Sequence, residues 1–154
     1  MDDADIETET PFSFDDYDNV IGFVVSQAGN RLSQGLAAAI ASLGSDLKPR
    51  EFAILNRLHQ YGKLTQVQLA ELTYKDKPAI TRMLDRLIAR KLVKKIVSRD
   101  DRRAFVVSLT PQGEAMRNAI VPLTVNLLKT ACQGISPKDL ETTVATLKRI
   151  SAQI

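Results

Sequence analysis

The apolar residues of this chain change their spacing once along its length and then change back. From residue 14 to residue 90 they recur mainly at the three- and four-residue spacing of an α-helix face. Between Leu92 and Leu109 alternation and β-branched residues replace that spacing, which is typical of two strands joined by the charged segment 98–102. Helical spacing returns from Pro111. The chain is therefore predicted to be mainly α with a small β-hairpin.

Local signals place three helices between Pro49 and the hairpin. Pro49 suits the first turn of a helix that Gly62 ends. Thr65 and Gln68 form a capping box, in which each side chain bonds the backbone N–H of the other residue. That box predicts a short helix over 66–72.

A third helix begins at Lys77, with Pro78 in its first turn. Helix, turn, helix and basic hairpin in succession predict a winged helix-turn-helix. Flanking it are helical spacing over 14–43, interrupted by three glycines, and helices expected over 111–133 and from 137 onwards.

These elements divide the chain into an arm, a winged domain and a helical layer. The segment 1–13 is predicted to be an acidic mobile arm, and 47–110 the winged helix-turn-helix DNA-binding domain. The terminal regions 14–46 and 111–154 are too apolar for the periphery of a monomer, so a two-fold dimerisation layer is expected. A helical layer within one chain is the alternative.

The net charge of +3 conceals a strong separation of charge along the chain. Residues 1–30 hold eight carboxylates and no Lys or Arg, whereas residues 75–103 hold eleven cations and four carboxylates. A basic cluster of this kind is the electrostatic footprint of a polyanion partner. A solvated surface is the alternative interpretation.

The helix that starts at Lys77 carries its charge on one side. Small or hydroxyl residues near its start would let it approach base edges closely, and Arg82 could reach a guanine edge or a phosphate. A surface helix with solvated arginines is the alternative. The apolar side holds Ile80, Leu84 and Leu87, and the basic side holds Arg82, Arg86 and Arg90.

The hairpin tip has a pattern suited to the minor groove, where the potential is most negative. Asp101 and Arg103 lie two positions apart, so the carboxylate could brace the guanidinium and fix its direction. A loop ion pair of little consequence is the alternative.

These segments together resemble the MarR family of bacterial transcriptional regulators. The resemblance is close from about Leu47 to Gly113 and rests on four stretches. They are residues 65–72, the run Asp76-Lys77-Pro78-Ala79-Ile80-Thr81-Arg82-Met83-Leu84-Asp85-Arg86-Leu87, then Asp101-Arg102-Arg103-Ala104, and Leu109-Thr110-Pro111-Gln112-Gly113.

The resemblance implies a homodimer that places two recognition helices in successive major grooves of a pseudo-palindromic operator and the wing arginine in the minor groove. It also implies a small-molecule pocket beside the dimer helices, often for aromatic or phenolic anions. Two positions depart from the family pattern: Lys91 stands where glycine is usual and Lys48 where threonine is usual.

The site residues follow from the basic cluster and from this resemblance. The predicted DNA-binding residues are Lys77, Pro78, Ala79, Thr81, Arg82, Arg86, Arg99, Asp101, Arg102 and Arg103. The candidate ligand-pocket residues are Phe23, Arg31, Phe52 and His59.

Catalysis, a cofactor and a metal are not expected. The chain has one histidine, His59, and one cysteine, Cys132, too few for a metal site built from several such ligands. No membrane span or leader is expected, and the cysteine content fits the cytoplasm. The function predicted is a DNA-binding regulator, most simply a repressor released by a small ligand. Two alternatives are a thiol-based redox sensor using Cys132 and a winged-helix module that binds protein rather than DNA.

Overall fold

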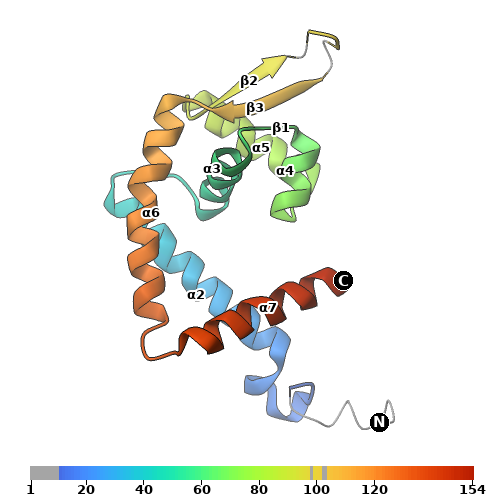
Figure 1. Cartoon of the computed structure of the whole chain (residues 1–154), viewed down its shortest axis with the longest axis vertical. Helices are drawn as coiled ribbons and strands as arrows, with labels where there is room; N and C mark the ends of the chain where they lie inside the picture. The colour runs from blue at the N-terminus through green and yellow to red at the C-terminus, as the bar shows by residue number, and fades with distance from the viewer. Residues whose placement is uncertain (1–10, 98, 102–103) are drawn as a thin grey trace.

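Two groups of elements lie at opposite ends of the molecule (Figure 1). The computed structural model describes residues 11–97, 99–101 and 104–154. One group is the winged helix-turn-helix. The other is an elongated set of helices, the helical arm, which is distinct from the acidic arm predicted over 1–13. The predicted fold class is therefore confirmed. The winged part contains α3 (Pro49–Tyr61), β1 (Lys63–Leu64), α4 (Gln66–Thr73), α5 (Lys77–Ala89), β2 (Val93–Val97) and β3 (Phe105–Leu109). The arm contains η1 (Phe14–Asn19), α2 (Ile21–Ser42), α6 (Pro111–Ala131) and α7 (Pro137–Gln153).

The N-terminal helical spacing covers two helices rather than one. Val20 is extended, with φ −66° and ψ 124°, and separates the 3-10 helix η1 from α2. The Val20 side chain is buried, whereas most of the residues that follow it on α2 are exposed. Apolar periodicity identified the helical segment but not this break in it.

The sheet has three antiparallel strands in the order β1-β3-β2. The predicted hairpin is the β2–β3 pair, in register from Val93 opposite Leu109 to Val97 opposite Phe105. The strand β1 was not predicted, because its two residues are too few for alternation to be visible. Lys63 and Leu64 pair with Ser108 and Val107, so β1 covers the other edge of β3.

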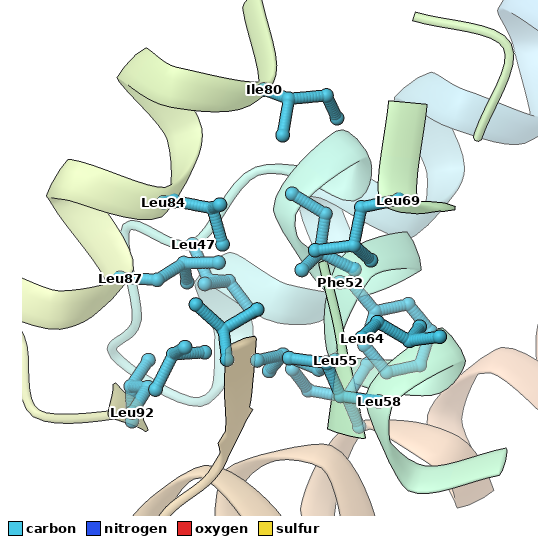
Figure 2. Close-up of a cluster of buried hydrophobic side chains, with 14 of the residues drawn as sticks. Leu47, Phe52, Leu55, Leu58, Leu64, Leu69, Ile80, Leu84, Leu87 and Leu92 are labelled. Atoms are coloured by element: carbon cyan, nitrogen blue, oxygen red, sulfur yellow. The ribbon is translucent and has the colours of Figure 1, made fainter. Parts of the chain in front are cut away.

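The hydrophobic core fills the winged part. Figure 2 shows leucines and Phe52 from α3, α4 and α5 converging with Leu47 and Leu92 around one centre. From the arm, only Ile40 and Ile120 belong to the buried members of this cluster. In contrast, α7 has no buried residue along its 17 positions. The arm therefore relies on the winged part for its core.

A close approach of two backbones joins the wing to the arm at the Leu-Thr-Pro-Gln-Gly run. Thr110 caps α6 by accepting a hydrogen bond from Gly113 N (3.0 Å), and its hydroxyl donates to the carbonyl of Lys91 (2.6 Å). A Cβ on Gly113 would lie 1.9 Å from the carbonyl oxygen of Leu92. Glycine is therefore required here for α6 to start against the base of the wing. The helix then continues through Pro122 as far as Ala131.

Candidate nucleic-acid interface

The helix α5 presents one buried side and one charged side. Asp76 caps it, because its Oδ1 accepts the N–H of Ala79 at 2.8 Å. Ile80, Leu84 and Leu87 are buried against the core. Of the residues predicted to contact DNA at the start of this helix, Lys77, Pro78, Thr81 and Arg82 are exposed and Ala79 is half-buried. The structure therefore brings these five together on one accessible surface.

Thr81 also links the two helices of the helix-turn-helix. Its Oγ1 accepts from Gln66 Nε2 at 2.9 Å and donates to the carbonyl of Lys77 at 3.0 Å. The hydroxyl proton is therefore used inside the protein, and toward an outside group Thr81 can act only as an acceptor. Sequence reasoning missed Gln66, which no local pattern relates to Thr81.

Arg86 and Arg90 differ from Arg82 in having acidic partners on the scaffold. Arg86 Nε lies 3.2 Å from Oε1 of Glu51, a carboxylate that is 1% exposed. Arg90 lies 3.0 Å from Asp46, on the α2–α3 connection. The three arginines expected on one basic side of α5 thus differ: Arg82 and Arg86 are exposed, Arg90 is half-buried, and Arg86 and Arg90 contact the scaffold. Spacing alone gave the shared side of the helix, but it could not show what packs beside it.

The start of α3 explains the buried carboxylate. Lys48, at the position before Pro49, offers no side-chain cap, as expected from the sequence. Glu51 supplies one instead, since its Oε2 accepts the N–H of Lys48 at 3.0 Å. An acidic residue in the first turn also favours the helix dipole.

The wing adds exposed cations beside α5. Lys94 and Lys95 on β2 are exposed, and Lys95 Nζ lies 3.8 Å from the centre of the Phe105 ring on β3. Arg99 and Asp101 are exposed in the connection between the strands. Arg102 and Arg103 lie outside the described residues, so the predicted Asp101–Arg103 brace stays a prediction.

The basic segment is presented as a surface. Among the described residues of 75–103, each Lys and Arg is exposed except Arg90, which is half-buried. These side chains come from the α4–α5 turn, from α5 and from the wing. The charge separation visible in the sequence thus becomes a cationic region formed by α5, the turn before it and the adjoining wing.

The four candidate ligand residues do not converge in the single chain. Phe52 lies in the core, and Arg31 is exposed on α2. The Phe23 ring packs on Tyr17, with centroids 4.6 Å apart. His59 is exposed at the end of α3, with Nδ1 2.5 Å from Oε1 of Glu114 on α6. A shared pocket for these residues stays a prediction.

The described residues contain no group of three or more His, Cys, Asp or Glu side chains able to hold a metal ion. Cys132 is half-buried at the end of α6, whereas His59 contacts Glu114 at the start of α6. Eighteen residues of helix separate Glu114 from Cys132, about 27 Å at 1.5 Å per residue, so a Cys–His pair does not form within the chain. Over the same residues, no helix is both long and apolar enough to cross a membrane.

Comparison with known proteins agrees with this geometry. Residues 45–104 match the sequence profile described as the MarR family. Over 94 residues the chain is 30% identical to the multiple antibiotic resistance protein MarR of Salmonella typhimurium. That match covers 61% of this chain and 62% of the relative, so the chain spans about three fifths of the length of the curated relatives it matches.

Two solved structures match over most of their length. A probable transcriptional regulator from Pseudomonas aeruginosa is 33% identical, with a TM-score of 0.77, over 86% of this chain and 98% of that chain. Bordetella bronchiseptica BpsR, whose DNA binding is regulated by 6-hydroxynicotinic acid, is 26% identical, with a TM-score of 0.79, over 88% and 95%.

The buried side of α5, its charged side and the adjoining basic wing define a winged helix-turn-helix of the kind that regulators of transcription carry. The profile match and these similarities support a MarR-type winged-helix regulator. Members of this family are transcription regulators.

Proposed function

We propose that this protein regulates transcription by binding double-stranded DNA as a homodimer. The observation that carries the proposal is the exposed N-terminal part of α5, where Arg82 is exposed on the side opposite a buried stripe and beside a basic wing. A helix of this kind fits the major groove, and the wing fits the adjoining minor groove. The residues proposed to contact DNA are the ten that the sequence predicts between Lys77 and Arg103.

The helical arm, whose long helices are α2, α6 and α7, supports a dimer in which the terminal helices of the two copies cover one another. Large apolar side chains are exposed on all three of its long helices, and a solvent-facing α7 with no buried residue is unusual for a stable monomer. The proposed domains are those predicted: 1–13 as an acidic arm, 14–46 and 111–154 as the dimerisation layer, and 47–110 as the DNA-binding domain. Residues 1–10 lie outside the described residues. A dimer presents two copies of α5, which suits a pseudo-palindromic operator.

We further propose that the protein is a cytoplasmic repressor released from DNA by a small aromatic or phenolic ligand. Regulation of BpsR DNA binding by 6-hydroxynicotinic acid supports a ligand of this class. Phe23, Arg31, Phe52 and His59 stay the proposed neighbours of the ligand.

The experiment that tests DNA binding uses the DNA directly upstream of the protein's own coding region. Binding is measured by fluorescence anisotropy over a series of salt concentrations, because phosphate contacts make affinity fall as salt rises. Arg82→Ala is expected to weaken specific binding by about 1–3 kcal/mol and to relax the preference at one base pair. Arg103→Ala is expected to weaken binding chiefly where the minor groove is narrow. Equal binding by wild type and both variants across the series would contradict this docking.

A further inference from the structure

A buried carboxylate lies between the scaffold and α5. Glu51 uses Oε2 to accept the N–H of Lys48 and directs Oε1 toward Arg86 Nε, 3.2 Å away. Within the described part of the chain, Oε1 accepts no well-aligned hydrogen bond. The contact with Arg86 is therefore mainly an attraction between charges. Because Glu51 is 1% exposed, water screens this attraction less than it would at the surface.

The same carboxylate forms part of the wall of a strongly basic hollow of about 280 Å³. Five of the lining side chains are cations and Glu51 is the one carboxylate among them. Cations this close repel one another, and a buried negative charge offsets that repulsion. We call this feature the basic hollow; its lining is Lys48, Arg50, Glu51, Lys75, Ala79, Arg82, Met83 and Arg86.

The basic hollow and the proposed DNA-contacting surface share one side of α5. Ala79, Arg82, Met83 and Arg86 recur at helical spacing, so they follow one another along that side. Both arginines are exposed, but Arg86 is held toward α3 by Glu51, whereas Arg82, one turn earlier, has no acidic partner among the described residues. The charge on Glu51 thus acts where the orientation of α5 determines what Arg82 can reach.

We propose that Glu51 is a positioning residue for operator binding. It touches no DNA; its charge draws Arg86 onto α3, lets the five cations converge and so fixes α5 for specific contacts. The inference rests on the proposed function, because it concerns the affinity of the same surface for DNA.

The test is Glu51→Gln, which keeps the size of the side chain and an acceptor for the N–H of Lys48 but removes the charge. If the Glu51 carboxylate acted only by repelling the DNA phosphates directly, removal of its charge would strengthen binding to every DNA. A positioning role predicts the opposite change: the affinity of Glu51→Gln for the operator falls about fivefold, the size expected when the coupling between two residues is lost. Affinity for a scrambled duplex stays equal or rises.

A matched control removes a carboxylate from α5 itself. Asp85 is exposed and has no ion-pair partner among the described residues, so Asp85→Asn is expected to leave operator affinity equal or higher.

The coupling between Glu51 and Arg86 is tested by changing Arg86. Arg86→Gln should weaken operator binding, Arg86→Lys should retain most of it, and adding Glu51→Gln to Arg86→Gln should produce no further loss.

Each outcome is decisive. Operator affinity of Glu51→Gln at or above that of wild type overturns the inference, as does an equal loss on both duplexes together with a lower melting temperature. Should Glu51→Gln fail to fold, Arg86→Gln measured on both duplexes still decides it: a larger loss on the operator than on the scrambled duplex supports positioning, whereas an equal loss on both is that of a phosphate contact alone and would overturn the inference. Wild-type protein that binds no DNA contradicts the proposed function itself, and the variants are not needed to see that.

Discussion

Lys91 occupies a backbone conformation that favours glycine. Its φ is +59°, in the left-handed region, at the position where α5 has ended and the wing begins. Its amide bonds the carbonyl of Ile88 and its carbonyl accepts the Thr110 hydroxyl, so the residue is held on both sides. A non-glycine residue in this region costs about 1–2 kcal/mol. The family pattern of glycine at this place thus has a direct physical basis.

Lys91→Gly is therefore expected to stabilise the fold. The strain energy that glycine relieves exceeds the cost of the greater conformational entropy it gives the unfolded chain. The free energy of unfolding is therefore expected to rise by a net amount on the order of 0.5 kcal/mol. Urea unfolding followed by circular dichroism measures it. Ala89→Gly, two residues earlier and inside α5, should instead cost about 1 kcal/mol. A loss of stability in Lys91→Gly as large as that in Ala89→Gly would contradict the strain.

Single residues also show why the site was only partly predictable. The exposure of Arg82 was predictable, because helical spacing places it opposite the buried Ile80 and Leu84. Arg86 has the same spacing yet contacts Glu51, which lies 35 positions earlier in the chain. Glu51 is recognisable in the sequence as an acid in a first turn, but nothing local indicates that it is buried. Partnerships between distant segments depend on packing that periodicity does not contain.

Among the elements, the junction between the wing and α6 depends most on a single residue. Gly113 lies against the carbonyl of Leu92 while its own N–H bonds the Thr110 hydroxyl. This arrangement ties β3, α6 and the residues after α5 into one unit. The run Leu109-Thr110-Pro111-Gln112-Gly113 was recognised from the sequence as a motif, and the structure supplies the reason for its glycine.

Gly113→Ala is expected to destabilise the protein by about 2–3 kcal/mol, because the added methyl group meets backbone rather than a flexible side chain. Gly29→Ala is its matched control, a second helical glycine with nothing within 4 Å of the added Cβ. There alanine should stabilise by about 0.5–1 kcal/mol through helix propensity. Thermal unfolding of the two variants should shift in opposite directions, and similar shifts would argue against the close approach.

Element prediction succeeded where a signal is local. The capping box at Thr65, the proline at Pro49 and the alternation of β2 and β3 all gave elements that the structure contains. The strand β1 and the break at Val20 were missed, because β1 is stabilised by pairing with β3 and because apolar spacing does not reveal the extended backbone of Val20. The strand β1 thus depends on a partner segment far away in the sequence.

At the scale of the whole molecule, the core and the apolar surface lie in different places. Buried side chains are concentrated in the winged part, while Val144, Leu147 and Ile150 form an exposed stripe on α7. On the proposed dimer this stripe is covered by the second copy. An unpaired carboxylate placed there would be buried at a cost of about 3–5 kcal/mol.

Leu147→Glu is accordingly expected to convert the dimer to a monomer of 17.0 kDa, measured by light scattering after gel filtration. Thr142→Glu introduces the same charge on the opposite side of α7 and should leave the dimer intact. If the mass of Leu147→Glu equals that of wild type, α7 is not part of the dimer contact.

Because the core is confined to one end of the molecule (Figure 1), the response of the protein to its own abundance follows from its fold. If the arm acquires its missing contacts only when two copies meet, DNA-competent molecules form by a second-order reaction. Operator occupancy then rises more steeply than in proportion to the number of chains in the cell. A change in synthesis or degradation would then alter operator occupancy more than it would for a regulator that binds as a monomer, a sensitivity that the DNA-binding surface alone does not provide.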